Sequence, residues 1–147
     1  MVEHKAWDWE KIETDIWYRP AEIAYYLAER WMQKGYSHFL DLGCGLGRHS
    51  LFFARKGFTV HSIDLSESAV EGLRATAAEQ NLPITAQCGD MSALPYQDDA
   101  FDCLLAYHVI SHTDTAGIKK ILSEIRRVVK NGGEVYLTLC SKNAWSY

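Results

Sequence analysis

The sequence predicts a doubly wound, mostly parallel α/β sheet in one domain. Short apolar segments alternate with amphipathic segments along the chain, turn residues separate them, and no internal repeat or linker interrupts the alternation. Strands separated by helices of about ten to fifteen residues imply βαβ units with right-handed crossovers. The 147 residues suit one domain and are enough to bury a core.

Each expected strand is a short apolar run, and each expected helix carries an apolar stripe. Pro20 suits the first turn of a helix that ends at Gly35, and Ser66 suits the N-cap of another. Asn131-Gly132-Gly133 is expected to end the last helix. The further expected elements, in chain order, are strand 38–42, helix 47–56, strand 58–63, helix 67–80, strand 84–88, strand 101–107, helix 118–129 and strand 134–140.

Composition and charge exclude several classes of protein. Apolar residues make up 48% of the chain, which excludes disorder, and no apolar run approaches the roughly 20 residues of a membrane span. The net charge of −4, without a basic stripe, argues against a nucleic-acid partner. The N-terminal residues show no signal peptide, and Cys44, Cys88, Cys103 and Cys140 lie far apart without a CxxC pair. We therefore expect reduced thiols and a cytoplasmic location.

Candidate ligand-binding residues follow three successive strands, where doubly wound sheets bind their ligands. Gly43, Gly45 and Gly47 form a loop that can turn sharply and approach a ligand closely. Asp64 ends the second strand and can accept hydrogen bonds from ribose hydroxyls, and Asp90 can accept one from an exocyclic amine such as that of adenine. Structural alternatives are a tight packing turn, an acid at a helix N-terminus and an Asx-turn, respectively.

This ordered set resembles the class I S-adenosylmethionine-dependent methyltransferases. The segment HFLDLGCGLGRHSLFFARKGFTVHSIDLS resembles their first two motifs, CGDMSALPYQDDAFDCLLAYHVISH the third and fourth, and GGEVYLTL the following strand. The similarity extends from about His38 to Cys140 and is closest in kind to the small-molecule enzymes of the ubiquinone and menaquinone type. It implies a Rossmann-like sheet in strand order 3-2-1-4-5 and S-adenosyl-L-methionine as the cofactor.

The resemblance also implies where the cofactor binds. Arg48, just after the glycines, either steers the cofactor carboxylate or is a solvated helix residue. The implied cofactor-binding residues are Asp41, Gly43, Cys44, Gly45 and Gly47 for the methionyl part, Asp64 and Leu65 for the ribose and the adenine face, Asp90 and Met91 for the adenine, and Ala106 and Tyr107 along the path to the methyl group.

A catalytic base is needed only for some acceptors. A sulfonium carries an activated methyl group, so its transfer depends on positioning and on the exclusion of water. A base matters when the acceptor arrives protonated, and the candidates are Tyr107, His108 and His112. The alternative for both histidines is a structural or pocket-lining role. Their i,i+4 spacing permits a metal pair, but no third ligand is evident, so no metal is expected.

Two other functions compete with a methyltransferase. The first is a module that binds the cofactor without catalysis, which binding motifs cannot exclude. The second is a nicotinamide-dependent oxidoreductase, because the loop read from Gly45 is one residue from the dinucleotide fingerprint. For the acceptor, no Asn/Asp-Pro-Pro-aromatic loop follows the fourth strand and no proline precedes a cysteine, which disfavours the base-methylating enzymes of DNA. We expect a small-molecule acceptor.

The two ends of the chain carry separate expectations. Segment 1–35 is expected as a helical cap on an α/β core at 36–140, with Trp17, Tyr18 and Arg19 closing over the cofactor as a lid; the alternative is a helix that covers the sheet. The resemblance implies seven strands, whereas the sequence ends soon after Cys140, so we expect a truncated domain with weak turnover. The fifth strand would be an open edge, which favours a homodimer through that edge or by C-terminal exchange over a monomer whose tail folds back on it.

Overall fold

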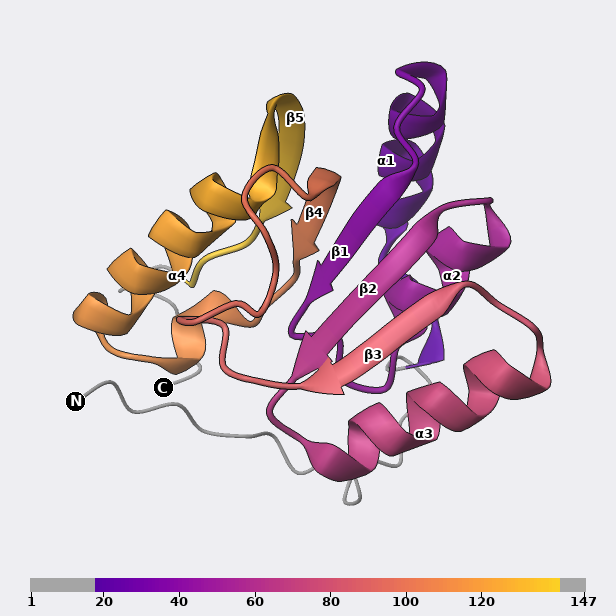
Figure 1. Cartoon of the computed structure of the whole chain (residues 1–147), viewed down its shortest axis with the longest axis horizontal. Coiled ribbons are helices and arrows are strands. Elements are labelled where there is room, and N and C mark those ends of the chain that lie inside the picture. Colours follow the sequence, from indigo (N-terminus) through magenta and orange to yellow (C-terminus); the bar gives the residue numbers. More distant parts are fainter. Residues whose placement is uncertain (1–17, 141–147) are drawn as a thin grey trace.

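The computed structural model describes residues 18–140, which form a five-stranded sheet with helices on both faces (Figure 1). The strand order is β3-β2-β1-β4-β5, and every neighbouring pair is parallel. This arrangement confirms the predicted doubly wound fold and its strand order. Trp17, predicted as part of a lid, lies outside the described residues.

The elements follow the expected alternation of strands and helices. Most bounds agree with the sequence prediction to within one or two residues, and Ser66 caps α3 as predicted by accepting a hydrogen bond from the amide of Ala69. The elements are α1 Glu22–Gln33, β1 His38–Leu42, α2 Arg48–Arg55, β2 Thr59–Asp64, α3 Glu67–Glu79, β3 Ile84–Cys88, β4 Phe101–Ala106, the short 3-10 helix η3 Ile110–His112, α4 Thr115–Val128 and β5 Val129–Leu137.

Alternating side chains of β1 supply two cores. Leu40 and Leu42 are buried in the cluster that contains the apolar face of α4, whereas Phe39 is buried in the cluster that contains α1 and α2. Because successive side chains of a strand point to opposite faces, this one strand fixes which helices lie on which side of the sheet. Among residues 18–140, the carboxyl ends of the strands lie between these two helix layers (Figure 1).

The end of α4 differs from the sequence prediction. We expected the helix to reach Val129 and a strand to begin at Glu134, but the helix ends at Val128 and β5 begins at Val129. Val129 is extended and pairs with Phe101, and Glu134 pairs with Cys103. The four residues 130–133 of β5 therefore lie opposite Asp102 alone, so this segment forms a bulge. The helix thus ends before Asn131-Gly132-Gly133, where its end was expected, because Val129 pairs with β4 instead.

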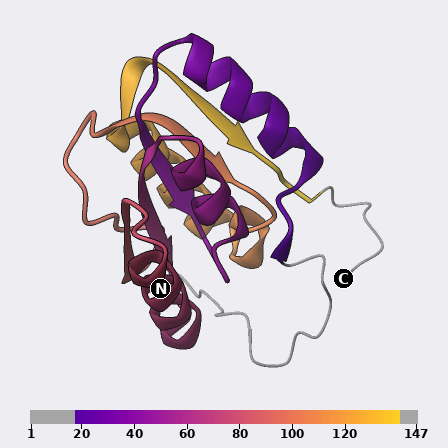
Figure 2. The ribbon, with the colours of Figure 1, turned by 90° about the vertical axis from the view of Figure 1, so that its right-hand side faces the viewer.

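Helix α1 lies beside β5 on one face of the sheet (Figure 2). The carboxylate of Glu134 accepts hydrogen bonds from Arg30 at 2.7 and 2.6 Å and from the indole of Trp31 at 2.9 Å. Trp31 is fully buried, and Leu27 is nearly so. In the described structure α1 thus covers the sheet. The predicted lid concerns the residues before it and stays a prediction.

Candidate functional site

The loop between β1 and α2 is held on the carboxyl end of β2. The amides of Gly43 and Cys44 donate to the carbonyl of Ile63 at 2.8 and 3.0 Å, and the amide of Gly45 donates to Oδ2 of Asp64 at 2.9 Å. Three successive amides are therefore bonded to two successive residues of the neighbouring strand. The path of the loop follows from these bonds.

Two positions of this loop require glycine. Gly43 and Gly47 have φ angles of +73° and +85°, in the left-handed region that other residues rarely adopt. A Cβ atom on Gly43 would overlap the side chain of Val109, and one on Gly47 would overlap that of Leu73. The predicted tight turn is therefore present, and it also brings α2 close to its neighbours.

Asp64 has the structural role that its sequence position suggested, at the start of α3, and its ribose-binding role stays a prediction. Its Oδ2 accepts the Gly45 amide, and its Oδ1 accepts the amide of Ser66, the N-cap of α3, at 2.9 Å. The residue is half-buried at the end of β2. Each carboxylate oxygen has two acceptor positions, so two amide bonds leave the carboxylate able to accept bonds from ligand hydroxyls.

Asp41 lies beneath the loop. It is 3% exposed, and its Oδ2 accepts a hydrogen bond of 2.6 Å from Ser50, whose hydroxyl also lies 2.7 Å from that of Ser62. Burial raises the pKa of Asp41 to about 6, although the Ser50 bond opposes the increase. The structure shows Asp41 as a support between β1, α2 and β2, and its contact with a cofactor stays a prediction.

Asp90 and Met91 lie in the loop after β3. Oδ1 of Asp90 accepts the amide of Ser92 at 2.8 Å and its hydroxyl at 2.7 Å, which is the Asx-turn considered from the sequence. Met91 is half-buried and packs against the core on the α4 side. The loop therefore has a defined shape at the point where an adenine is predicted to bind.

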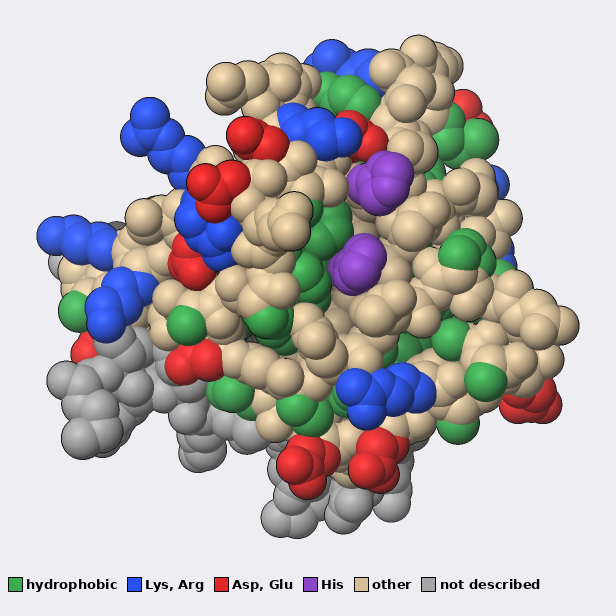
Figure 3. All heavy atoms as spheres, in the orientation of Figure 1, with side chains coloured by type: hydrophobic (Ala, Val, Ile, Leu, Met, Phe, Trp, Pro, Cys, Tyr) green, Lys and Arg blue, Asp and Glu red, His purple; other side chains and the backbone are tan. Residues whose placement is uncertain are grey.

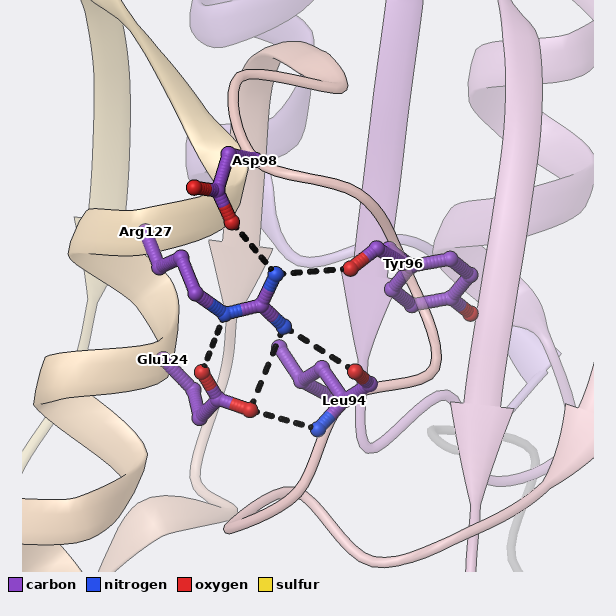
Figure 4. A network of polar contacts seen from close by, with 5 residues as sticks. All are labelled: Leu94, Tyr96, Asp98, Glu124 and Arg127. Atoms are coloured by element: carbon purple, nitrogen blue, oxygen red, sulfur yellow. Dashed lines mark hydrogen bonds and ion pairs between the residues drawn. The ribbon is translucent and has the colours of Figure 1, made fainter.

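Arg127 of α4 fastens the rest of this loop (Figure 4). Its guanidinium donates to the carbonyls of Leu94 and Tyr96 at 3.0 and 2.7 Å and to the carboxylates of Asp98 and Glu124 at 2.9 and 2.6 Å. Glu124 in turn accepts the amide of Leu94 at 2.9 Å. The sequence shows Arg127 only as one of a basic pair, so its anchoring role was missed.

A pocket of about 750 Å³ opens beyond the ends of β4 and β5. Its lining includes Tyr107, His108, Arg48 and Arg19, which were singled out from the sequence, and Tyr136 and Thr138, which were not. Of these, Thr138 lies inside the expected strand 134–140 and directly follows β5 only because that strand ends at Leu137, so no signal in the sequence marks it. The lining residues are Arg19, Pro20, Ala21, Glu22, Ile23, Arg48, Tyr107, His108, Tyr136 and Thr138.

His108 has a strained backbone at this pocket. Its φ is +55°, which is uncommon outside glycine and is often found at functional sites. Its amide donates to the hydroxyl of Thr138 at 2.6 Å, and the same hydroxyl lies 3.2 Å from Nδ1 of the imidazole. Thr138 therefore holds both the backbone and the ring. The side chain of His112, the other candidate, is not among those described.

The remaining predicted residues occupy different environments. Leu65 is half-buried after Asp64, whereas Ala106 is fully buried and its carbonyl accepts the Thr138 amide at 3.1 Å. Cys44 packs in the cluster that contains α3, and burial raises the pKa of its thiol. Its side chain is thus part of the core. Within residues 18–140, no group of three described His, Cys, Asp or Glu side chains could hold a metal ion, and no described helix is long and apolar enough to cross a membrane.

Comparisons with known proteins agree with this geometry. A family described as "Methyltransferase domain" matches residues 39–133. Ubiquinone biosynthesis O-methyltransferase of Coxiella burnetii is 28% identical over 122 residues, which are 83% of this chain and 51% of the relative. A SAM-dependent methyltransferase structure from Methanosarcina mazei has a TM-score of 0.68 and 26% identity, over 81% of this chain and 57% of that one. The structure of the [4+2]-cyclase SpnF has a TM-score of 0.69 and 31% identity, over 77% of this chain and 42% of that one.

The fold and the loops at its open edge are those of a class I S-adenosylmethionine-dependent methyltransferase. The chain belongs to the methyltransferase-domain family, as its resemblance predicted, and S-adenosylmethionine is the cofactor that this family implies. The chain spans about half the length of the curated relatives it matches.

The residues present fit this cofactor. Gly43 and Gly47 have no side chain where the loop after β1 turns, and the half-buried carboxylate of Asp64 lies beside this loop. The shaped loop with Asp90 follows the next strand of the sheet. These positions supply close backbone approach, an acceptor for ribose hydroxyls and an acceptor for an exocyclic amine.

Asp41→Asn should change the pH dependence of stability. The raised pKa means that the folded state binds the Asp41 proton more tightly than the unfolded state, so this stabilisation is present below about pH 4 and is lost as the pH rises through about 6. Between pH 4 and 7, the difference in unfolding free energy should shift in favour of Asp41→Asn by about 2–2.5 kcal/mol. Urea denaturation at both pH values measures it, and a difference independent of pH would contradict the burial of this charge.

Arg127→Met should loosen the loop that carries Asp90 and Met91. Removing the guanidinium leaves Glu124 and two carbonyls without this donor, so we expect the unfolding free energy to fall by about 1–3 kcal/mol. Binding of S-adenosylhomocysteine, measured by calorimetry, should weaken several-fold. The control is Arg126→Met on the exposed side of α4, which should change stability by less than about 0.5 kcal/mol. Equal effects of the two substitutions would show that Arg127 does not anchor the loop.

Proposed function

We propose that this chain is the cofactor-binding part of an enzyme that transfers a methyl group from S-adenosylmethionine to a small molecule. The observation that carries the proposal is the order in which the site residues follow the carboxyl ends of neighbouring strands. The glycine loop, Asp64 and Asp90 follow β1, β2 and β3, and the 750 Å³ pocket follows β4 and β5 on the other side of β1. The similarity to an enzyme named as an O-methyltransferase supports an oxygen acceptor.

Within this proposal the cofactor residues have distinct roles. Asp64 accepts the ribose hydroxyls and Leu65 packs on the adenine face. Asp90 and Met91 bind the adenine. Gly43, Cys44, Gly45 and Gly47 approach the methionyl part through their backbone, supported from below by Asp41. The fixed shapes of these loops support the proposal, because groups already held in place lose little freedom on binding.

The pocket would hold the acceptor and exclude water. When bound, the cofactor supplies an activated methyl group on a sulfonium. The rings of Tyr107 and Tyr136 flank the acceptor, and the chain brings acceptor and methyl group into line. With a hydroxyl acceptor, His108 receives its proton at the imidazole while Thr138 orients the ring. Tyr107 and His112 stay the other candidates for this role.

A second function is a cofactor-binding protein that does not transfer methyl groups. The similarity to the structure of SpnF favours this function, because that protein has a similar fold but is named as a [4+2]-cyclase and not as a methyltransferase. The discriminating measurement is turnover of S-adenosylmethionine to S-adenosylhomocysteine with a panel of phenols, carboxylates and amines. Tight binding without turnover for any of them favours the second function, whereas turnover with one of them favours methyl transfer.

The surface charges and the thiols of the chain support the proposed kind of partner and the proposed location in the cell. On the face shown in Figure 3, Lys and Arg side chains are interspersed with Asp and Glu, which supports a small molecule over a nucleic acid as the partner. Cys44, Cys88 and Cys103 are free, and Cys88 is exposed. An exposed free thiol supports a reducing compartment, so a cytoplasmic location belongs to the proposal.

Asp64→Ala tests the cofactor assignment. Removing a carboxylate that accepts hydroxyl hydrogen bonds should weaken S-adenosylhomocysteine binding by about 1.5–3 kcal/mol in calorimetry. Glu67→Ala, which removes an exposed carboxylate at the start of α3, is the control and should leave the affinity unchanged. Unchanged affinity in a folded Asp64→Ala variant would exclude the ribose role. Stronger binding of NADH than of S-adenosylhomocysteine would favour an oxidoreductase.

A homodimer through the β5 edge is the proposed assembly. β5 lies at the end of the described sheet, and Val135 on it is 38% exposed. An uncovered strand edge can pair with a second copy. Light scattering of the 147-residue chain should give twice the chain mass, and Val135→Lys should return it to a monomer. A wild-type monomer at high concentration would overturn the assembly.

A further inference from the structure

Two neighbouring side chains at the start of α2 hold the segment that precedes α1. The amide of Ala21 donates to Nε2 of His49 at 3.1 Å, and the guanidinium of Arg48 donates to the carbonyl of Arg19 at 3.2 Å. These bonds join residues 28 and 29 positions apart in the chain. The segment therefore has its position set by α2 as well as by its own helix.

His49 is suited to accept this bond. It is 5% exposed, and burial together with the neighbouring Arg48 lowers its pKa to about 3. The imidazole is thus neutral, with one ring nitrogen available as an acceptor. The ring also packs edge-on against Tyr107 at a centroid distance of 5.5 Å, and the guanidinium of Arg48 lies 5.4 Å from the centre of the same ring.

The two held residues belong to the pocket wall. Arg19 and Ala21 line the pocket together with Arg48 and Tyr107, whereas His49 lies behind that wall. Arg48 and His49 also directly follow Gly47, the last residue of the glycine loop. The same short piece of chain therefore joins the loop that approaches the cofactor to the wall that faces the acceptor.

We propose that Arg48 and His49 form a latch that positions wall residues 19–23 of the acceptor pocket and transmits cofactor binding to that wall. The inference rests on the proposed function, because it takes the glycine loop as the cofactor site and the pocket as the acceptor site. A ligand on the loop restrains the start of α2, and the latch passes that restraint to Arg19 and Ala21. His49 is a positioning residue, since it acts through Ala21.

Amide hydrogen exchange of the full chain tests the latch at the bonded atom. His49→Phe keeps a flat ring against Tyr107 but removes the acceptor, whereas His49→Gln keeps an acceptor near the place of Nε2. We expect the Ala21 amide to exchange about tenfold faster in His49→Phe than in the wild type, and His49→Gln to restore most of the protection. The matched control is His61→Phe, because His61 packs edge-on against Tyr96 and Phe101 in the same way, away from this wall.

A second measurement uses S-adenosylhomocysteine as the probe. Its binding should slow exchange at Ala21 further in the wild type and in His49→Gln, but not in His49→Phe. Arg48→Met keeps an apolar stem on Tyr107 and should make amide hydrogen exchange in segment 19–23 several-fold faster. If His49→Phe does not fold, this variant tests the latch in its place.

The outcomes separate the latch from the proposed function. Equal exchange at Ala21 in wild type and His49→Phe, or an accelerated His49→Gln, would overturn the latch. Probe binding that leaves Ala21 of the wild type unchanged would overturn its link to the cofactor loop. Failure of the probe to bind any of these proteins would count against the proposed function, whereas exchange without the probe still judges the latch.

Discussion

The hydrogen bonds between the end of β2 and the loop after β1 are the constraint on which the rest of the site depends. They commit the amides of Gly43, Cys44 and Gly45 to Ile63 and Asp64, so the chain can only leave β1 toward α2 along one path. That path determines where α2 begins and which of its side chains reach the pocket. Asp41 supports it from inside through Ser50, at the cost of a buried carboxylate.

The sequence predicts the fold and the strand-end residues well because both depend on local signals. The alternation of apolar and amphipathic segments identifies the strands and helices. A glycine or aspartate directly after a strand marks the carboxyl end of the sheet, where ligands bind. Arg127 and His49 carry no such signal, because their hydrogen-bond partners other than Glu124 lie some 30 positions away in the sequence, and most of these are backbone atoms. Such contacts depend on how the layers pack. The predicted start of β5 was wrong for the same reason, because the strand begins where Val129 pairs with the distant residue Phe101.

Asp64 and Asp90 both have the structural role suggested by the sequence, and this role is compatible with the proposed contacts to a ligand. Each carboxylate accepts hydrogen bonds from backbone that follows it, to the helix start in one case and within an Asx-turn in the other. Those bonds fix the direction of each side chain before a ligand arrives. Local structure of this kind lowers the entropy that binding must overcome.

The bulge in β5 limits how a further strand can pair with the outer side of β5, the last strand of the described sheet. Continuous pairing with β4 runs only from Glu134 to Leu137, whereas the first part of the strand is distorted over 130–133. Four residues of regular strand offer about 13 Å of straight edge. A bulged strand is also strongly twisted, which hinders flat stacking of many chains. The edge is therefore long enough to add one short strand, yet badly shaped for growth into a fibre.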